Sequence, residues 1–255
     1  IYFLNKLRAE IANHPVSKHP AIQILNDGVI DKESLQQIHL EYRHAIVQVF
    51  IDALLMAQFQ TKQLEPRLES GSKMFPRFLL TLNILDEFGY RPGLDEEGYY
   101  SGNPEYAHYP LFEDVLNDFE LSQSERNEYK PSLISHKVRA YLENSFNDYK
   151  AIAALLAVAE EEVILFSPAL RHATHAVGFD VDSGYYFVHG VSDDTTAEAA
   201  DDDHEDDLWL ILAQACTEND YDYIRKICFE YCNLWQQFWD KQIDNLQYEP
   251  YKKLA

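Results

Sequence analysis

The sequence predicts an all-α protein that folds as a single domain. Over long segments, apolar residues recur every three and four positions, which is the period of a helix and not of a strand. Glycine is scarce, with nine in 255 residues. No Pro-, Ser- or Gly-rich linker divides the chain, and no repeat with a period of about 20 to 50 residues is visible. These observations favour one helical domain over two joined domains.

The clearest helix is expected at 32–61, where Asp31 stands as an N-cap before a continuous apolar face. A second helix is expected at 72–88 and should end at Gly89, although Pro76 lies early in it. Further helices are expected near 2–13, 105–119, 132–146, 147–166, 185–191, 204–217 and 218–246. The last is rich in aromatic residues, which at helical spacing indicates core packing.

Two segments interrupt the helical pattern and are interpreted as loop insertions, at about 90–104 and about 192–203. The first has turn chemistry and no periodicity. The second opens an acidic run in which nine of the fifteen residues from Asp193 to Asp207 are Asp or Glu. Such a run indicates a solvated loop.

Composition excludes several classes of function. The formal net charge of -22 repels phosphate backbones and anionic lipids, so no nucleic-acid partner is expected. The longest apolar run, Ala151 to Ala159, is much shorter than the roughly 20 residues that span a membrane, so no membrane segment is expected. Three cysteines are too few for a disulfide framework, which favours a cytoplasmic protein.

Ten histidines accompany this excess of carboxylates, and imidazole with carboxylate is the ligand set that suits iron. Glu87 shares a helix face with Leu80 and Ile84, which orients it inward. His108 follows the first loop, and Glu105 lies about one turn before it.

Three consecutive glutamates, Glu160, Glu161 and Glu162, interrupt an apolar helix. Because burying an unpaired carboxylate costs several kcal/mol, at least one of them should have a cationic or metal partner. The alternative is that all three lie on a solvent-exposed face of the helix, although three consecutive residues span about 200° around the helix axis. A last group of polar residues contains His189, Asp193, Asp201 and His204.

These segments resemble a known family. The stretch HPAIQILNDGVIDKESLQQIHLEYRHAI (19–46) looks like the opening of the TenA/PqqC-like proteins of haem-oxygenase fold. NILDEFGY, HYPLF, the glutamates of LLAVAEEE and YYFVH resemble, in that order, the metal-ligand segments of the haem-oxygenase-like di-iron oxidases and oxygenases. The similarity spans about 19–215. It implies one haem-oxygenase-like bundle of about seven to nine helices over residues 1–255.

The resemblance also implies a site. Two ferrous ions would be the cofactor, which the isolated protein need not retain, held by Glu87, His108, Glu160 as a bridge, His189, Asp201 and His204. The fallback ligands are Glu105 for Glu87, Glu161 for Glu160 and Asp193 for Asp201, and Glu96 in the first loop stays open. The residues expected around the cavity, as substrate contacts or electron donors, are Glu41, Tyr42, His44, Tyr185 and Tyr186.

One departure from the family pattern concerns its last motif, His-x-x-x-Asp-x-x-His. His189 and Asp193 fit this spacing, but Thr196 stands where the second histidine is expected, and the end of the motif reappears as Asp201 and His204. In one unbroken helix, His189 and His204 would lie about 22 Å apart. Either the acidic run loops out and returns His204 to the site, or His204 is a surface residue and the site is incomplete.

The resemblance therefore implies a non-haem di-iron oxidase or oxygenase that activates dioxygen to oxidise a small, fatty-acid-like or amino-acid-like substrate. One alternative is a metal-free TenA-like hydrolase of pyrimidine derivatives, but that activity requires a nucleophilic cysteine in mid-chain, and all three cysteines follow residue 215. The other is a non-catalytic protein that binds a small molecule or a protein partner through its acidic loop. A homodimer is compatible with the sequence.

Overall fold

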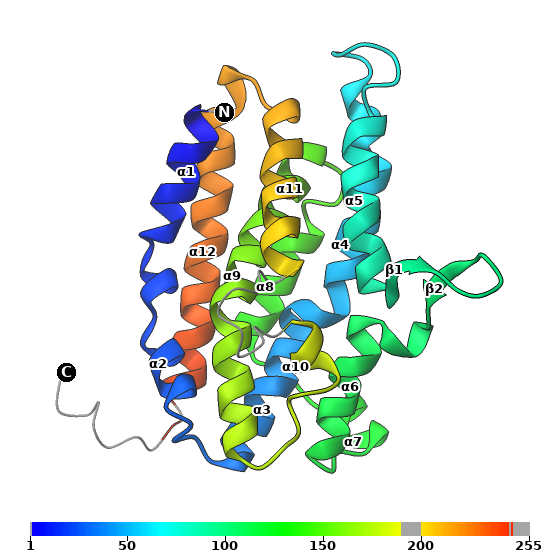
Figure 1. The fold of residues 1–255 in the computed structure, drawn as a ribbon. Coiled ribbons are helices and arrows are strands. Elements are labelled where there is room, and N and C mark those ends of the chain that lie inside the picture. Colours follow the sequence, from blue (N-terminus) through cyan, green and yellow to red (C-terminus); the bar gives the residue numbers. More distant parts are fainter. Residues whose placement is uncertain (1, 190–199, 245, 247–255) are drawn as a thin grey trace.

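The helical period of the sequence is realised as a bundle of long helices, described in a computed structural model for residues 2–189, 200–244 and 246 (Figure 1). Within these residues, nine helices have eleven residues or more, in agreement with the expected seven to nine, and α2, α7 and α10 are shorter. The helices are α1 (Tyr2–Ala12), α2 (Pro20–Asn26), α3 (Lys32–Tyr42), α4 (Gln48–Gln60), α5 (Met74–Glu87), α6 (His108–Asp118), α7 (Gln123–Glu128), α8 (Leu133–Glu143), α9 (Tyr149–Ala176), α10 (Tyr185–Val188), α11 (Ala200–Ala215) and α12 (Tyr221–Asp244).

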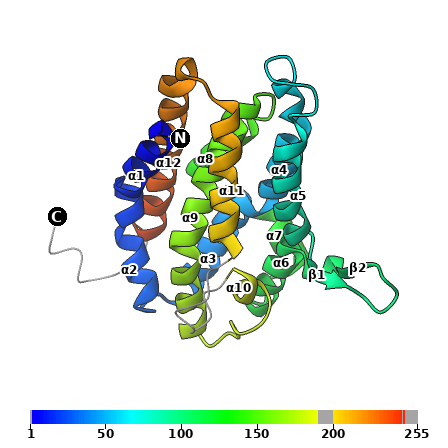
Figure 2. The ribbon, with the colours of Figure 1, turned by 45° about the horizontal axis from the view of Figure 1, so that its top comes forward.

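Helix α9 is the centre of the bundle. It contacts α2, α4, α8, α11 and α12, and its alanine-rich first half allows these neighbours to approach closely (Figures 1 and 2). Asp148 caps its start by accepting hydrogen bonds from the N–H groups of Lys150 and Ala151. The helix runs ten residues beyond the predicted end at 166. Pro168 removes one backbone donor but does not end a helix whose sides are packed.

The helix expected at 32–61 is present as α3 and α4, joined by a single π-helical turn at Arg43–Val47. Asp31 caps it as predicted, because its carboxylate accepts a 2.8 Å hydrogen bond from the N–H of Ser34. The π-helical turn has no counterpart in the predicted pattern. Such turns often mark functional sites, and this one lies against the cavity described below.

The first predicted loop is instead a β-hairpin that projects from the bundle (Figure 2). Strand β1 (Tyr90–Leu94) pairs antiparallel with β2 (Tyr100–Gly102). Asp95 closes the tip, since its carboxylate accepts hydrogen bonds from the N–H groups of Glu97 and Tyr99. The sequence indicated turn chemistry here, and the two short strands were missed because a strand of so few residues carries no readable alternation.

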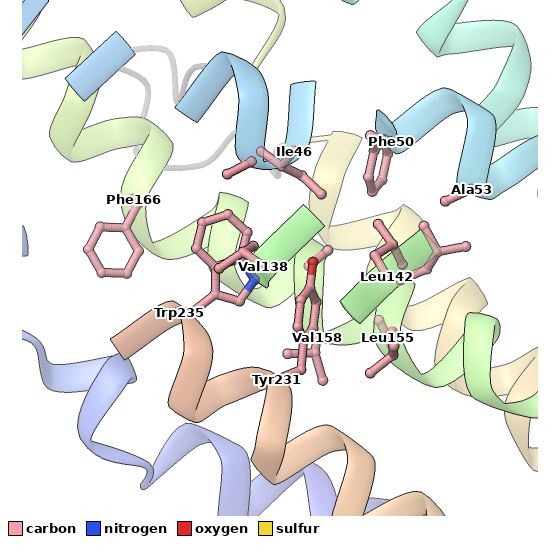
Figure 3. Close-up of a cluster of buried hydrophobic side chains, with 14 of the residues drawn as sticks. Ile46, Phe50, Ala53, Val138, Leu142, Leu155, Val158, Phe166, Tyr231 and Trp235 are labelled. Carbon is pink, nitrogen blue, oxygen red and sulfur yellow. The ribbon is translucent and has the colours of Figure 1, made fainter. Parts of the chain in front are cut away.

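The second predicted loop lies mostly outside the described residues, but its last part, 200–203, belongs to α11. The core lies where α4, α8, α9 and α12 meet, and Figure 3 shows Phe50, Leu142, Val158 and Trp235 packed there. Among the described helices, none has the length and apolar character needed to cross a membrane.

Candidate metal centre

Helices α5 and α6 place a carboxylate beside an imidazole. Glu87 is the last residue of α5, and His108 is the first residue of α6. Between them, Gly89 turns the chain into the hairpin with φ +80°, and a Cβ there would lie 2.5 Å from backbone atoms of Asn103 and Ala107. The hairpin is thus closed at its base, and Nδ1 of His108 lies 3.0 Å from Oε1 of Glu87.

His189 completes a set of three side chains. It follows α10 directly, and its ring centroid lies 4.3 Å from that of His108 in an edge-to-face contact. One possible ligand atom from each of Glu87, His108 and His189 lies within 4.8 Å of the other two. Two histidines with one carboxylate are the donor set of non-haem ferrous sites that keep coordination positions open. These three buried or half-buried side chains therefore fit one transition-metal ion.

Glu160 reaches the same place from α9. It is buried and lines a small cavity of about 30 Å³ together with Glu87, His108 and His189, room enough for one or two water-sized species. Its Oε1 accepts a 3.0 Å hydrogen bond from Nδ2 of Asn83, one turn before Glu87 on α5. Oδ1 of Asn83 is itself buried, with no hydrogen-bond partner among the described residues.

The three consecutive glutamates point in three directions. Glu161, the fallback for Glu160, lies away from the cavity, with Oε1 at 3.6 Å from Nε of Arg8. Glu162 is buried and accepts 2.8 Å hydrogen bonds from the Tyr42 hydroxyl and from Nε1 of Trp239. Burial raises the pKa of Glu162 to about 8. Successive residues of a helix are rotated by about 100°, which places the three glutamates in different environments. The alternative that all three are solvent-exposed is therefore wrong.

Burial also perturbs a second carboxyl group on the far side of α9. Glu205 of α11 faces both Glu161 and Arg8. Burial, followed by the neighbouring Glu161 carboxylate, raises the pKa of Glu205 to about 8. The cluster joins α1, α9 and α11 and is separate from the cavity.

The remaining cavity wall is mainly apolar and aromatic. The π-helical turn presents Ile46 and Val47, and Tyr185 packs its ring 4.5 Å from that of His189. The other wall residues are Tyr42, Phe50, Tyr109 and Val163. Two of the expected cavity residues, Tyr42 and Tyr185, therefore lie where the sequence placed them.

A wider cleft of about 540 Å³ opens on the outer side of His108. It lies between the hairpin, which contributes Tyr90 and Arg91, and the segment before and within α10, which contributes Asp182 and Phe187. His108 lines both the cleft and the inner cavity, so it forms the wall between them.

Asp86 and Asn83 were not predicted from the sequence. Oδ2 of Asp86 lies 3.6 Å from Nε2 of His108, on the side of the ring opposite Glu87. A carboxylate behind a histidine is the usual support of a metal-bound imidazole. The sequence offers only their position as a signal, because Asp86 adjoins Glu87 and Asn83 precedes Glu87 by four residues.

Glu41 and His44 do not line the cavity, contrary to expectation. The Glu41 carboxylate holds the start of α8, since it accepts hydrogen bonds from the Tyr129 hydroxyl and from the N–H and hydroxyl of Ser132, the N-cap residue of that helix. His44 points to α8 as well, with Nε2 at 2.9 Å from Nδ1 of His136. The π-helical turn changes the angular position of His44, which an ideal α-helix would have aligned differently.

Tyr186 also lies away from the cavity. Its hydroxyl is 2.6 Å from Nε2 of His39 in the core. Of the fallback ligands, Glu105 is exposed at the base of the hairpin and hydrogen-bonded to Asn103, and Glu96 is exposed at its tip.

His204 lines a separate small cavity with Asp207 and with Asn83, the residue that donates a hydrogen bond to Glu160. It therefore does not line the cavity of Glu87 and His108 among the described residues. The backbone of Asp201 belongs to α11, while its side chain lies outside the described part of the structure, as does all of Asp193.

Comparison with solved structures identifies the fold. A TenA homolog from Pseudomonas syringae has a TM-score of 0.67 at 11% identity, covering 95% of this chain and 91% of that one. A CADD-like protein of unknown function from Nostoc punctiforme has a TM-score of 0.64 at 14% identity, over 94% and 97%. A domain of unknown function with a heme oxygenase-like fold from Shewanella denitrificans has a TM-score of 0.63 at 14% identity, over 99% and 96%.

No protein-family model and no curated protein matches the sequence. The chain is a single all-α domain with the haem-oxygenase-like fold, as the sequence predicted. It carries a candidate metal-binding cluster of one carboxylate and two imidazoles between α5, α6 and α10.

Proposed function

We propose that this protein is a non-haem iron-dependent oxidase or oxygenase that uses dioxygen to oxidise a small fatty-acid-like or amino-acid-like substrate. The convergence of Glu87, His108 and His189 supports the proposal most directly, because their ligand atoms lie within 4.8 Å of one another inside a helical bundle. In the chain these residues are separated by about 20 and 80 positions, so the fold and not the local sequence brings them together.

Glu87, His108 and His189 would hold one ferrous ion. Glu160 would be shared with a second iron, for which the resemblance implies Asp201 and His204 as further ligands, although His204 here lines the neighbouring cavity beside Asn83. Bound iron with open positions would supply the electron transfer to dioxygen that organic side chains do not provide.

Side chains around the cluster would fix its ligands. Asp86 would hold the outer nitrogen of His108, and Asn83 orients the carboxylate of Glu160 through its 3.0 Å hydrogen bond. The walls formed by Ile46, Phe50 and Val163 would keep bulk water from the reaction.

The outer cleft would admit the substrate. It is lined by apolar and aromatic side chains with a few charged ones, which is the character of small-molecule sites. His108 would then stand between the bound substrate and the inner cavity.

The metal-free hydrolase is supported less well. The described structure keeps Cys228 and Cys232 buried in α12 and Cys216 partly buried after α11. None of the three lines the inner cavity or the outer cleft, so a cysteine nucleophile for that reaction is missing from both.

Anaerobic titration of the metal-free protein with ferrous iron tests the proposal. We expect about two irons per chain, and loss of binding at micromolar iron in His108→Ala and in Glu160→Ala, because each removes a ligand. Glu105→Ala is the matched control, since it removes an exposed carboxylate near the cavity and should leave binding unchanged.

Circular dichroism should show that every variant keeps its helices. Failure of the folded wild-type protein to bind iron would contradict the proposed function and favour a non-catalytic binding protein. Binding of a single iron that His204→Ala does not weaken would instead limit the centre to one ion.

A further inference from the structure

A row of four oxidisable aromatic side chains leads from the inner cavity to the molecular surface. Tyr42 lines the cavity, and its ring centroid lies 5.9 Å from that of Trp235. Trp235 lies 6.0 Å from Tyr231, one turn earlier on α12, and Tyr231 stacks on Tyr141 of α8 at 5.7 Å. Figure 3 shows Trp235 and Tyr231 on successive turns of α12.

The outer end of this aromatic row (Tyr42, Trp235, Tyr231 and Tyr141) has a carboxylate that can take a proton. The Tyr42 hydroxyl donates a 2.8 Å hydrogen bond to Glu162, and the Tyr141 hydroxyl donates a 2.6 Å hydrogen bond to the exposed Glu230. Tyrosine loses an electron readily only when its hydroxyl proton can leave at the same time. The row therefore meets this condition at its outer end, at Tyr141.

The two middle members differ from the ends. The hydroxyl of Tyr231 and Nε1 of Trp235 are both buried and face each other, and neither makes a regular hydrogen bond to another described residue. Trp235 can give up an electron without first losing a proton, and Tyr231 brings its ring into contact with Tyr141.

We propose that the aromatic row is an electron relay between the protein surface and the metal centre, an inference that rests on the proposed function. Trp235 gives one electron across the ring of Tyr42 to the oxidised iron centre, which is thereby reduced by one electron, and Trp235 is left as an indole radical cation.

Tyr141 then gives an electron to Trp235 across the ring of Tyr231, and its proton passes to Glu230. A one-electron reductant in solution, such as ascorbate, restores Tyr141 by supplying an electron and a proton. Each step moves one electron inward, so the buried centre is reduced without opening the cavity to the reductant.

The first test uses the metal-free protein, so that it does not depend on iron binding. Exposed Lys137, one turn before Tyr141 on α8, is replaced by cysteine in a Cys216→Ser background and labelled with a ruthenium tris-bipyridine photo-oxidant. A flash with a quencher then withdraws an electron at the Tyr141 end. We expect a tyrosyl radical in the otherwise unchanged protein and, in Tyr141→Phe, an indole radical by transient absorption, reduced at least tenfold when Trp235→Phe is added.

In the Tyr141→Phe background, Tyr231→Phe should keep the indole radical, because the bridging ring remains. Tyr149→Phe is the matched control, since Tyr149 is buried and its hydroxyl has no hydrogen-bond partner within the described part of the chain, but its ring is not part of the row. An indole radical of unchanged yield when Trp235→Phe is added to Tyr141→Phe would overturn the relay, whether or not the protein binds iron.

The second test asks whether the relay exchanges electrons with the iron centre. Iron-loaded protein is exposed repeatedly to dioxygen without substrate or reductant, and oxidised residues are mapped by peptide mass spectrometry. Oxidation should collect at Tyr141 in the wild type and fall at least tenfold there in Trp235→Phe. Equal oxidation of Tyr141 in both proteins, with iron bound, would overturn the relay while leaving the proposed function standing.

Discussion

His39 is held neutral in the core by its surroundings. Its Nδ1–H donates a 2.8 Å hydrogen bond to the carbonyl of Leu35, and Nε2 accepts one of 2.6 Å from the hydroxyl of Tyr186. Burial lowers the pKa of His39 from 6.5 to about 4. The imidazole therefore acts as a packed polar core residue and not as a ligand.

This lowered pKa predicts a pH dependence of stability. Between the two pKa values the unfolded chain binds one more proton than the folded chain, so the free energy of unfolding falls as the pH drops from 6.5 towards 4, by up to about 3 kcal/mol from this residue. In His39→Gln, urea denaturation from about pH 7 to about pH 5 should show a shallower loss than in the wild type.

The control for His39→Gln is His172→Gln, because His172 is exposed on α9. It should leave the pH dependence as in the wild type. If His39→Gln and the wild type lose stability with the same slope, His39 is not the group that titrates on unfolding.

Residue types and apolar context indicated Glu87, His108, Glu160 and His189, and the structure brings these four into one cavity. The orientation of a single side chain was harder to predict. Glu41 shares α3 with Tyr42, yet it holds the start of α8 while Tyr42 lines the cavity. The sequence shows which helix a residue belongs to, but the neighbour that each helix face meets is decided by packing.

The hairpin is the element that sets the distance between Glu87 and His108. Gly89 and Gly102 face each other at its base, and a Cβ on Gly102 would lie 2.6 Å from the carbonyl oxygen of Gly89. Both glycines are therefore required by close backbone approach as well as by positive φ. The tip, which carries Gly98 with φ +87°, is open.

This contrast predicts different costs for the same substitution. Gly98→Ala should cost about 1–2 kcal/mol at most, because only the positive φ is strained. Gly89→Ala has the same strain plus a collision with rigid backbone, so it should cost more than about 3 kcal/mol and weaken iron binding. Urea denaturation and iron titration of both variants provide the measurement.

Gly98→Ala is also the control, because it shares the φ and lies in the same hairpin. Equal stability and equal iron affinity of the two variants would show that the hairpin base does not position the ligands.

Helices were easier to predict than their irregularities. The helix at 32–61 follows from its apolar period and from Asp31, but the π-helical turn at Arg43–Val47 adds a local widening that the period does not reveal. Likewise, α9 continues ten residues past the predicted end at 166, and Pro168 within this extension does not break it.

At the scale of the whole molecule, the net charge of -22 is the dominant electrostatic property. Exposed carboxylates repel one another across the surface and lower the stability of the compact state. The few ion pairs that hold exposed groups, such as Lys6 with Glu10, contribute little in comparison.

We therefore expect salt to stabilise the protein. Raising NaCl from about 0.01 M to about 0.15 M shortens the screening length from about 30 Å to about 8 Å, which weakens the repulsion and should raise the melting temperature by several degrees. An uncharged osmolyte at matched osmolality is the control. A melting temperature that falls with salt would show that attractive pairs outweigh the repulsion.

The overall fold was predictable because scarce glycine, helical period and motif order all agreed. The position of His204 was not, since it depends on how the chain between α10 and α11 returns to the bundle. Spacing along one helix would have placed His204 about 22 Å from His189, while the structure places it beside Asn83, the neighbour of Glu160.

Glu160, Glu161 and Glu162 face three different surroundings. Which glutamate faces the cavity therefore depends on the number of residues between it and the cap of α9 at Asp148. A chain that lost one alanine between Ala151 and Ala159 would keep its charge and its helix, yet Glu161 would stand at the angle of Glu160. Glu161, which lies beside Arg8 in the present chain, would then face His108 and His189. In this fold, the register of α9 determines which glutamate faces the candidate metal site as much as the residue types do.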